Sequence, residues 1–584
     1  MTTVNRICES VKPSRGPGRP PMRTPAKEQE IIRTCVKAAI VEGQMPSDGE
    51  LAGEVGLGER TVRDIRLWAG LNRWQVAAWV KEREALQNQS PEEIVLCTTP
   101  CAGVWLLVPL IMRSALSSAV QLLHWTTRTG IDVWQWVLTI VMWAVLGFRR
   151  FSHLDDFRHA ADLGLALFTG RVRLLADSTV WRLIHTLQPE SAEAFYQETA
   201  AEAVPLNTPQ GEEWISMDEH VVGFFTKLKP RPLKKTRVPT RGRSYPAIRL
   251  YAPFHLWSGR FVGLVVTKAT LALSQVLPTL IAEVRRLRKG AGHPQPQQVD
   301  VILDRGAYKG ALFEQLMSDP DVRFIAMARA TQKNVPQWEA VPEEAFEAYQ
   351  PKGEQNPNLK IAETTTKISD CQYPLRTVLI RDDTPETRQR WRALFTKVSI
   401  EELKPAEVDV TYRRRQDHEN SFAELDHHLA GKCLPKPYHL VREANEKGQK
   451  RKTVATTLSA ETMSGLRFVA WLRHWTYNLV KDFGAALGDR YATMEVGTLV
   501  RKFIARPGIL RLRGNQLQVT LMPFTGCAAL DGWIRQINEQ RFTVPWLGHL
   551  ILQIEIAPIP VGLSADPRTV RQRIFANSQS PLLT

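Results

Sequence analysis

Two stretches of the chain, WISMDEHVVGFF (214–225) and QVDVILDRGAY (298–308), decide the fold that we predict. The first predicts a strand with Asp218 in its middle, and the second predicts a buried strand, VDVIL, that ends on Asp304. A carboxylate in an apolar strand is costly to bury without a partner. One such acid is usually structural, but two on strands of one core indicate a shared ligand.

The segments around these stretches predict an α/β core. Two more strands, AIRLYAPFHLW (247–257) and RFVGLVVTKA (260–269), come before a helix, SQVLPTLIAEVRRLRK (274–289). After VDVIL the chain predicts another helix, KGALFEQLMS (309–318), and another strand, VRFIAMA (322–328). Three strands, a helix, a fourth strand and further α/β units are the order of a ribonuclease H-like core.

A third acid lies in VTYRRRQDHENSFAELDHHL (410–429), within a helix that we predict over about 408–429. Tyr412, Arg415 and Glu419 follow one another at three- and four-residue steps, so they share one helix face. A helical Glu beside two strand-borne Asp residues is the arrangement that two-metal phosphoryl transfer needs, because carboxylate oxygens hold Mg²⁺. The sequence therefore predicts one site built from these three acids.

The same helix carries a resemblance to a known family. Tyr412, Arg415 and Glu419 fit Y-x2-R-x3-E, the first part of the Y-x2-R-x3-E-x6-K signature of bacterial insertion-sequence transposases of the DDE type. DRGAY (304–308) resembles the second-aspartate motif of that group, and MDEHV (217–221) resembles its first-aspartate strand. A strand-bearing insertion before the Glu also matches the layout of the group.

The resemblance covers roughly residues 150–480 and departs from the signature at one position. The signature lysine would fall at position 426, where this chain has Asp426. Spacing does not show whether Lys432 or Lys436 takes its place, so the role of the lysine stays unassigned.

The resemblance implies a DNA transposase that hydrolyses phosphodiesters at transposon ends and then transfers the strand into target DNA. It implies that Asp218, Asp304 and Glu419 are catalytic and hold two Mg²⁺ ions per site, with Mn²⁺ as an alternative. Tyr412 and Arg415 would contact phosphates of the transposon end. Bringing two ends together implies a homodimer or a larger synaptic complex, in the bacterial cytoplasm at the nucleoid.

Each carboxylate has an alternative. Glu219 could take the place of Asp218, because only one of two neighbours on a strand points inward. Asp304 could simply cap the helix that follows it. The competitors of Glu419 on its helix are Asp417, Glu424 and Asp426. None of the three has the offset from the signature Tyr and Arg that Glu419 has.

The N-terminal part predicts two DNA-binding elements. Residues 1–26 predict a flexible basic arm, in which Arg19 lies in a short segment resembling an AT-hook that binds the minor groove. A plain basic linker is the alternative. SDGELAGEVGLGERTVRDIRLWAG (47–70) has helix-turn-helix spacing, with Thr61 as the cap of the second helix, and a generic helical hairpin is the alternative. The residues that would face DNA are Arg60, Thr61, Arg63 and Arg66.

The formal net charge is +16, which favours a polyanionic partner, nucleic acid before an anionic membrane. No acid occurs between Glu219 and Glu283, and KLKPRPLKKTRVPTRGR (227–243) in that window carries eight Lys and Arg residues. Its place beside the first aspartate predicts contacts to the DNA backbone, for which we take Lys234 and Lys235. A solvated basic loop is the alternative.

Two apolar stretches bear on whether the chain enters a membrane. VWQWVLTIVMWAVLGF (133–148) is shorter than the roughly 20 apolar residues of a span, so we predict a buried core helix and no membrane partner. A membrane-embedded hairpin with residues 104–112 is the alternative. The seven cysteines are scattered, so we expect reduced thiols and no zinc site.

The length and ordinary composition predict a folded chain of several regions. We expect a basic arm (1–26), a helix-turn-helix domain (27–90), a helical region (91–212), the catalytic core (213–333 and 408–485), an insertion subdomain (334–407) and a C-terminal α+β region (486–584). Two other functions stay open. One is a DNA-binding regulator or inactive transposase relative, and the other is a metal-dependent nuclease without strand transfer.

Overall fold

A computed structural model describes residues 27, 30, 31, 34, 35, 46–68, 93–125 and 131–558. Short stretches within the last range are excepted: 151, 160–161, 172, 210, 225–234, 239–242, 354–355, 385–389, 435–439, 445–450 and 456–459. The predicted basic arm with Arg19, most of the basic run with Lys234, and the alternative Lys436 lie outside the described residues.

The largest sheet has nine strands in the order β11-β12-β13-β14-β10-β9-β2-β6-β7. Its strands are β2 (Trp214–Met217), β6 (Phe254–His255), β7 (Arg260–Phe261), β9 (Val299–Leu303), β10 (Val322–Met327), β11 (Glu347–Ala348), β12 (Leu359–Thr366), β13 (Leu375–Asp382) and β14 (Trp391–Thr396). β9 runs parallel to both of its neighbours, β2 and β10, and the other pairs are antiparallel. All five residues of β9 are buried, as its continuous apolar run predicts.

Each of the three strands predicted between 214 and 269 is in fact broken into two. One part of each joins the nine-stranded sheet. These parts are the start of the first strand (β2), the end of the second (β6) and the start of the third (β7). The other parts are β3 (Glu219–Gly223), β5 (Arg243–Tyr251) and β8 (Val265–Lys268), which form a second sheet with β4 (Lys235–Val238). Pro253 lies in the break between β5 and β6, where it has no N–H to donate to a strand ladder. The break between β2 and β3 falls at Asp218.

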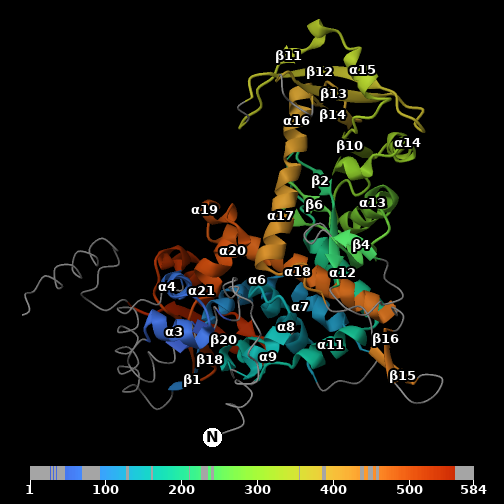
Figure 1. Ribbon diagram of the computed structural model, residues 1–584. Helices are drawn as coiled ribbons and strands as arrows, with labels where there is room; N and C mark the ends of the chain where they lie inside the picture. Colours follow the sequence, from blue (N-terminus) through green and yellow to red (C-terminus); the bar gives the residue numbers. More distant parts are fainter. Residues whose placement is uncertain are drawn as a thin grey trace, which may run out of the picture.

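The helices of this core are α13 (Leu273–Gly290), α14 (Gly310–Ser318), α16 (Pro405–Arg413) and α17 (Arg415–His428). The helix predicted over 408–429 thus begins earlier, at a proline suited to a first turn, and is divided at Arg414. In Figure 1 the two parts lie almost in line, from the strands β11–β14 at one end to α18 at the other.

His418 fixes α17 against the large sheet. Its side chain is fully buried, and its ring stacks on Phe254 of β6 at 5.1 Å between centroids. Its Nδ1 lies 2.9 Å from the hydroxyl of Ser216 on β2. Burial lowers the pKa of His418 well below its usual range, so the ring is neutral. These contacts fix the position of α17 relative to the end of β2.

The predicted insertion, 334–407, continues the central sheet, because β14 pairs with β10. It also contains α15 (Val335–Glu339) and the 3-10 turn η5 (Glu343–Ala345). The fully buried Asp409 of α16 ties it to the long helix pair. Its Oδ2 lies 2.9 Å from Tyr349 Oη, 2.9 Å from Arg392 Nη2 and 2.8 Å from Arg413 Nε.

Most of the described residues between 93 and 209 are helical. Its helices are η1 (Ala102–Leu107), α6 (Val108–Arg113), α7 (Leu116–Ala119), η2 (Val120–Leu122), α8 (Val133–Val145), α9 (Ser152–His159), α10 (Leu163–Phe168), α11 (Asp177–His185) and α12 (Pro189–Glu202). They pack around α18 (Ala460–Ala486), where Trp136 stacks on Phe468 at 4.6 Å and Trp471 donates to the Thr199 hydroxyl at 2.8 Å. α8 is the predicted buried core helix.

No single helix of the described residues has the length and apolar character of a membrane span. One pair of short helices, Ala102–Arg113 and Leu116–Leu122, passes that test together and is bent by 81°.

The helical prediction for 91–212 is wrong at its start, where β1 (Glu93–Thr99) pairs with β17. The five-stranded C-terminal sheet has the order β1-β17-β18-β20-β19. Its other strands are β17 (Gly508–Arg513), β18 (Gln516–Leu521), β19 (Thr543–Val544) and β20 (Leu550–Ile556). The remaining elements of this end are the hairpin β15 (Leu440–Ala444) and β16 (Arg451–Ala455), with α19 (Asp489–Ala492), α20 (Val496–Leu499), η6 (Val500–Ile504), η7 (Cys527–Leu530), α21 (Asp531–Gln540) and η8 (Pro545–Leu547).

A helix pair, α3 (Asp48–Val55) and α4 (Glu59–Trp68), lies against this sheet. Ser47 and Glu50 form a reciprocal capping box at α3, and Gly56 ends the helix at φ +64°. The buried side chains of the pair pack on Ile509 and Met522. Thr61 is not the cap that we predicted, because α4 begins two residues before it.

Candidate active site

One guanidinium, that of Arg415 on α17, lies among the three predicted carboxylates. Its Nη1 is 2.8 Å from Oδ2 of Asp218, and its Nη2 is 3.7 Å from Oδ1 of Asp304. Nη2 also pairs with Oε1 of Glu419, one turn further along the helix. The fold thus brings together acids from the end of β2, the end of β9 and the face of α17.

Asp218 stands where the chain leaves one sheet for the other. Its side chain is 19% exposed, and its Oδ1 accepts a hydrogen bond from the backbone N–H of Glu219 at 2.7 Å. Burial raises the pKa of Asp218, and Arg415 opposes that rise. The side chain of Glu219 instead pairs with Arg249 at 2.9 Å. Of these two neighbouring acids, Asp218 is therefore the one in contact with Arg415.

Asp304 follows β9 directly and precedes the 3-10 turn η4 (Arg305–Ala307). Within the described residues its side chain makes no hydrogen bond that caps this turn, and it is 36% exposed. Tyr308, at the end of the same motif, accepts a hydrogen bond from Asn334 Nδ2 at 2.7 Å. The capping alternative therefore does not account for the orientation of Asp304.

Glu419 is 41% exposed, and its competitors on α17 have other partners. Asp417 is exposed next to Arg414, Glu424 accepts a hydrogen bond from the N–H of Val496 at 2.9 Å, and Asp426 pairs with His220 and Lys432. The signature offset and the contacts of Arg415 thus select the same glutamate.

Tyr412 and Arg415 line the site from successive helices. Tyr412 is 7% exposed in the last turn of α16, and burial raises its pKa to about 12, with Arg415 opposing the rise. The side chain of Arg415 is 13% exposed. Burial opposes its charge, but Asp218 and Asp304 raise the pKa of Arg415. The guanidinium is therefore charged at any pH at which the protein is folded.

The chemistry of the three carboxylates suits a divalent cation, because their oxygens are the ligands that Mg²⁺ prefers and they already surround a positive charge. In the described part of the chain, however, no three His, Cys, Asp or Glu side chains are grouped closely enough to hold a metal ion. Arg415 occupies the space where the three carboxylates meet. Direct coordination therefore requires that the guanidinium move aside.

A second charged group follows two turns further along α17. Asp426, at the position of the signature lysine, has its Oδ1 3.2 Å from His220 Nε2, and its Oδ2 pairs with Lys432. His220 also stacks on Phe422 at 4.8 Å. His220, which lies on β3 two residues after Asp218, was not singled out from the sequence.

The predicted DNA-facing residues of α4 are not equivalent. Arg60 and Arg63 are exposed, and Thr61 is half-buried. Arg66 is 12% exposed and pairs with Asp48 at 3.0 Å within the helix pair, whereas Arg63 pairs with the same carboxylate at 3.1 Å but is 61% exposed. Lys235 begins β4, but its side chain is outside the described part.

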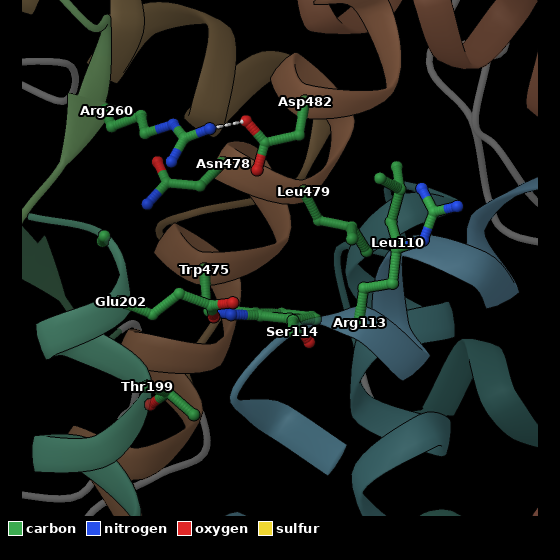
Figure 2. Close-up of a pocket in the computed structure, with 11 residues that line it drawn as sticks. Leu110, Arg113, Ser114, Thr199, Glu202, Arg260, Trp475, Asn478, Leu479 and Asp482 are labelled. Carbon is green, nitrogen blue, oxygen red and sulfur yellow. Dashed lines mark hydrogen bonds and ion pairs between the residues drawn. The ribbon is translucent and has the colours of Figure 1, made fainter. Parts of the chain in front are cut away.

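Of the cavities, one of about 200 Å³ lies away from the carboxylates, between α6, α12, β7 and α18. Figure 2 shows Arg260 and Asp482 paired on one side of it, with Trp475 and Glu202 below. Charges of both signs line it, and the three carboxylates of the site are not among its lining residues. We assign it to the packing of the helical region against the core.

Comparison with known proteins gives a family match over the middle of the chain. Residues 170–432 match the family model of the transposase DDE domain, and all three carboxylates lie within the match. This match supports a DDE-type transposase. No curated protein matches the chain.

A solved structure of the piggyBac transposase synaptic complex with hairpin DNA, determined by cryo-EM, is also similar. The sequence identity is 11%, the match covers 69% of this chain and 78% of that one, and the TM-score is 0.35. A likeness of this size carries no argument about fold or function.

Proposed function

From the premise of a DDE-type transposase domain over residues 170–432, we propose that the chain is a DNA transposase. It hydrolyses phosphodiesters at transposon ends and joins the freed 3′-OH to target DNA. The observation that carries the proposal is the meeting of Asp218, Asp304 and Glu419 around Arg415.

We infer a ribonuclease H-like core. In support, β7, β6 and β2 are antiparallel neighbours, and β9 and β10 follow beside β2 in parallel. The helix α13 separates the third strand from β9 along the chain. This is the order of three strands, helix and fourth strand that the sequence predicts.

Asp218, Asp304 and Glu419 would hold the divalent ions, Mg²⁺ or Mn²⁺. When bound, the ions would supply charge stabilisation to the attacking and leaving oxygens of phosphoryl transfer. No protein nucleophile is needed, because positioning and charge stabilisation account for most of this chemistry. Arg415 and Tyr412 bind phosphate oxygens of the transposon end, and drawing Arg415 to a phosphate would free the carboxylates.

DNA recognition falls to α3 and α4, which we interpret as a helix-turn-helix. In support, a glycine turn joins two short helices, and Arg60 and Arg63 are exposed on the second. The net charge of +16 supports a nucleic-acid partner. A homodimer or larger complex follows from the need to hold two ends at once.

The test is a cleavage and strand-transfer assay with Mg²⁺ or Mn²⁺ on DNA carrying the inverted repeats that flank the gene. Asp218→Ala, Asp304→Ala and Glu419→Ala should each abolish both steps and leave DNA binding intact. Matched controls are Glu219→Gln, beside the first aspartate, and Asp417→Asn, on the helix of the glutamate. Both controls should keep activity.

The outcomes separate the proposal from its rivals. Cleavage without joining would indicate a nuclease, and DNA binding without either step would indicate a regulator or inactive relative. Full activity in any one of the three alanine variants would remove that residue from the site.

A further inference from the structure

A groove of about 1030 Å³ lies at the end of the central strands that is opposite to the carboxylates. It is lined by Trp214 at the start of β2, Gln298 just before β9 and Arg323 near the start of β10. These three strands run parallel, and Asp218 and Asp304 follow the other ends of β2 and β9. The groove is therefore separate from the proposed catalytic site.

The groove exposes apolar side chains to water. Val410 on α16 is 50% exposed and Leu206, before β2, is 47% exposed, and both line the groove. Ile400, two residues after the lining residue Val398, is exposed as well. Three of the eight exposed large apolar side chains of the described residues thus lie in this region. Such a concentration indicates a surface that a partner covers.

The groove also has an excess of negative charge. Arg323 is the one Lys or Arg among its described lining residues, which include four acids: Glu212, Glu213, Glu402 and Glu407. Arg414 pairs with the first of these acids and Arg288 with the second, and Arg323 pairs with both Glu402 and the buried Asp300. Five acids thus face three arginines. In a chain of net charge +16, such a groove repels DNA phosphates and favours a cationic partner.

One lining side chain leaves a hydrogen-bond donor unused. His293 is 7% exposed, and its Nδ1 accepts a hydrogen bond from the N–H of Gln295 at 3.1 Å, so Nε2 carries the proton. Within the described residues this Nε2 makes no hydrogen bond, and it lies 3.5 Å from Oε1 of Glu213. A buried donor without a partner is costly, so an acceptor from an occupant of the groove would stabilise it.

The N-terminal arm of the chain has the composition that this groove fits. Residues 11–26 contain Lys12, Arg15, Arg19 and Arg23, together with five prolines and no acid. Guanidinium groups pair well with carboxylates, and proline offers apolar surface without an N–H that needs a partner. The arm therefore complements both the charge and the apolar character of the groove.

The position of Lys27 indicates that the arm reaches the groove of a second copy. Its Nζ donates to the carbonyl of Val55 at 2.8 Å, so the arm begins at α3. No residue of α3, α4 or the five-stranded sheet is among the described lining residues. In Figure 1, α3 and α4 lie toward the α18 end of the pair α16–α17, and α16 lies at the other end. The 14 residues of α17 span about 21 Å, whereas Arg23 lies within about 14 Å of Lys27.

We propose that the groove binds residues 11–26 of a second copy of this chain, with Arg19 and Arg23 pairing with Glu402 and Glu407. The exchange is reciprocal, because each chain has one arm and one groove. The proposal goes beyond the proposed function, since this contact holds two copies together without DNA. An arginine held in the groove is not available to DNA, so the exchange also limits DNA binding by the arm.

Sedimentation velocity of the full chain without DNA tests the proposal over a range of protein concentrations. Arg19→Glu/Arg23→Glu should weaken self-association by about 10-fold or more, because repulsion replaces two exposed ion pairs. Glu402→Lys/Glu407→Lys should weaken it to a similar extent. An equal mixture of the two variants should associate as the wild-type chain does, because the acidic arm of one then meets the basic groove of the other.

Glu401→Lys is the matched control, because Glu401 is exposed beside Glu402 and does not line the groove. It should associate as wild type. Glu402→Gln/Glu407→Gln removes the same charges without adding cations, so it tests the groove even if the lysine variant fails to fold, and it should weaken association by a few-fold. A synthetic peptide of residues 11–26 should compete with self-association, and the same peptide with Arg19→Glu and Arg23→Glu should not.

A wild-type chain that stays monomeric, or self-association that neither charge-reversed variant changes, would overturn this inference alone. Failure of the mixed variants to associate would also overturn it, because the arm would then not bind the groove of another copy. The cleavage and strand-transfer assay decides the proposed function separately, so failure of one proposal is distinguishable from failure of the other.

Discussion

The helix pair α16–α17 carries two acid–arginine clusters that are opposite in composition. On α16 one acid, Asp409, meets two arginines and a tyrosine, and its side chain is 0% exposed. On α17 one arginine, Arg415, meets three acids that are 19–41% exposed. The first cluster has an excess of positive charge, and its acid is shielded from water although its arginines are 28–30% exposed. The second has an excess of negative charge and is open, which is the condition under which a cation can enter.

Burial and charge balance therefore distinguish a structural cluster from a candidate site, even when both lie on the same pair of helices. A fully buried acid that pairs with two arginines and a tyrosine stabilises the junction of the insertion with the helix. Acids that face one another across a single arginine repel, so their grouping opposes stability and indicates a functional site. Three variants test this contrast.

Asp409→Ala should have the largest effect on the fold. It leaves the guanidinium groups of Arg392 and Arg413 without their buried carboxylate, and breaking such a group typically costs about 3–5 kcal/mol. Urea unfolding of the variant and the wild-type chain measures the free energy of unfolding. Asp417→Ala, an exposed acid on α17, should change it by less than about 0.5 kcal/mol. A similar, small loss in both variants would contradict the structural role of Asp409.

Arg415→Ala should act on chemistry and metal binding. Cleavage should fall by about 100-fold or more, the typical effect of removing one preorganised donor to a developing charge. Without DNA, the variant should bind Mn²⁺ more tightly than wild type, because the guanidinium no longer competes for the carboxylates.

Electron paramagnetic resonance of free Mn²⁺ measures that affinity directly. Arg414→Ala is the matched control, because Arg414 pairs with Glu212 instead of the three acids. Equal or weaker Mn²⁺ binding by Arg415→Ala would show that the guanidinium does not compete with the metal.

Asp218→Asn should have the smallest effect, and one that depends on pH. Burial raises the pKa of this carboxyl above its usual 3.8, so the folded state binds its proton more tightly than the unfolded state. The wild-type chain therefore loses stability as pH rises through the raised pKa, and the neutral amide does not. Urea unfolding from pH 4 to pH 8 should show the variant gaining stability relative to wild type with rising pH. A constant or decreasing difference would contradict the sign of the shift.

Local patterns in the sequence predicted the elements of the core and the acids on them. The alternation around Asp218, the apolar run before Asp304 and the Tyr–Arg–Glu spacing each depend on a few neighbouring residues. Periodicity could not predict the break of each strand between two sheets, because it follows from tertiary pairing. The division at Arg414 and the strand β1 likewise depend on partners distant in sequence.

The contacts between residues distant in the sequence could not be predicted from the sequence alone. That Arg415 lies among the three acids, and that Asp426 holds Lys432, depends on how α17 meets β2 and β3. Sequence spacing left Lys432 and Lys436 equal; Lys432 pairs with Asp426, and Lys436 lies outside the described residues. Arg66 shows the reverse case, where a residue of correct type and spacing is committed to an internal ion pair.

The strands from β11 to β7 pair in one continuous sheet, which has a consequence for the proposed binding of DNA. The strands of 334–407 extend the same sheet that positions Asp304, so the insertion and the core share one sheet. The buried Asp409 fixes α16 to this sheet through Arg392. Any phosphate bound on the outer strands lies at a fixed distance from the carboxylates before DNA arrives. On the proposed function, the sheet therefore fixes the distance between such a contact and the point of cleavage, and lengthening or shortening one of its loops would move the contact alone.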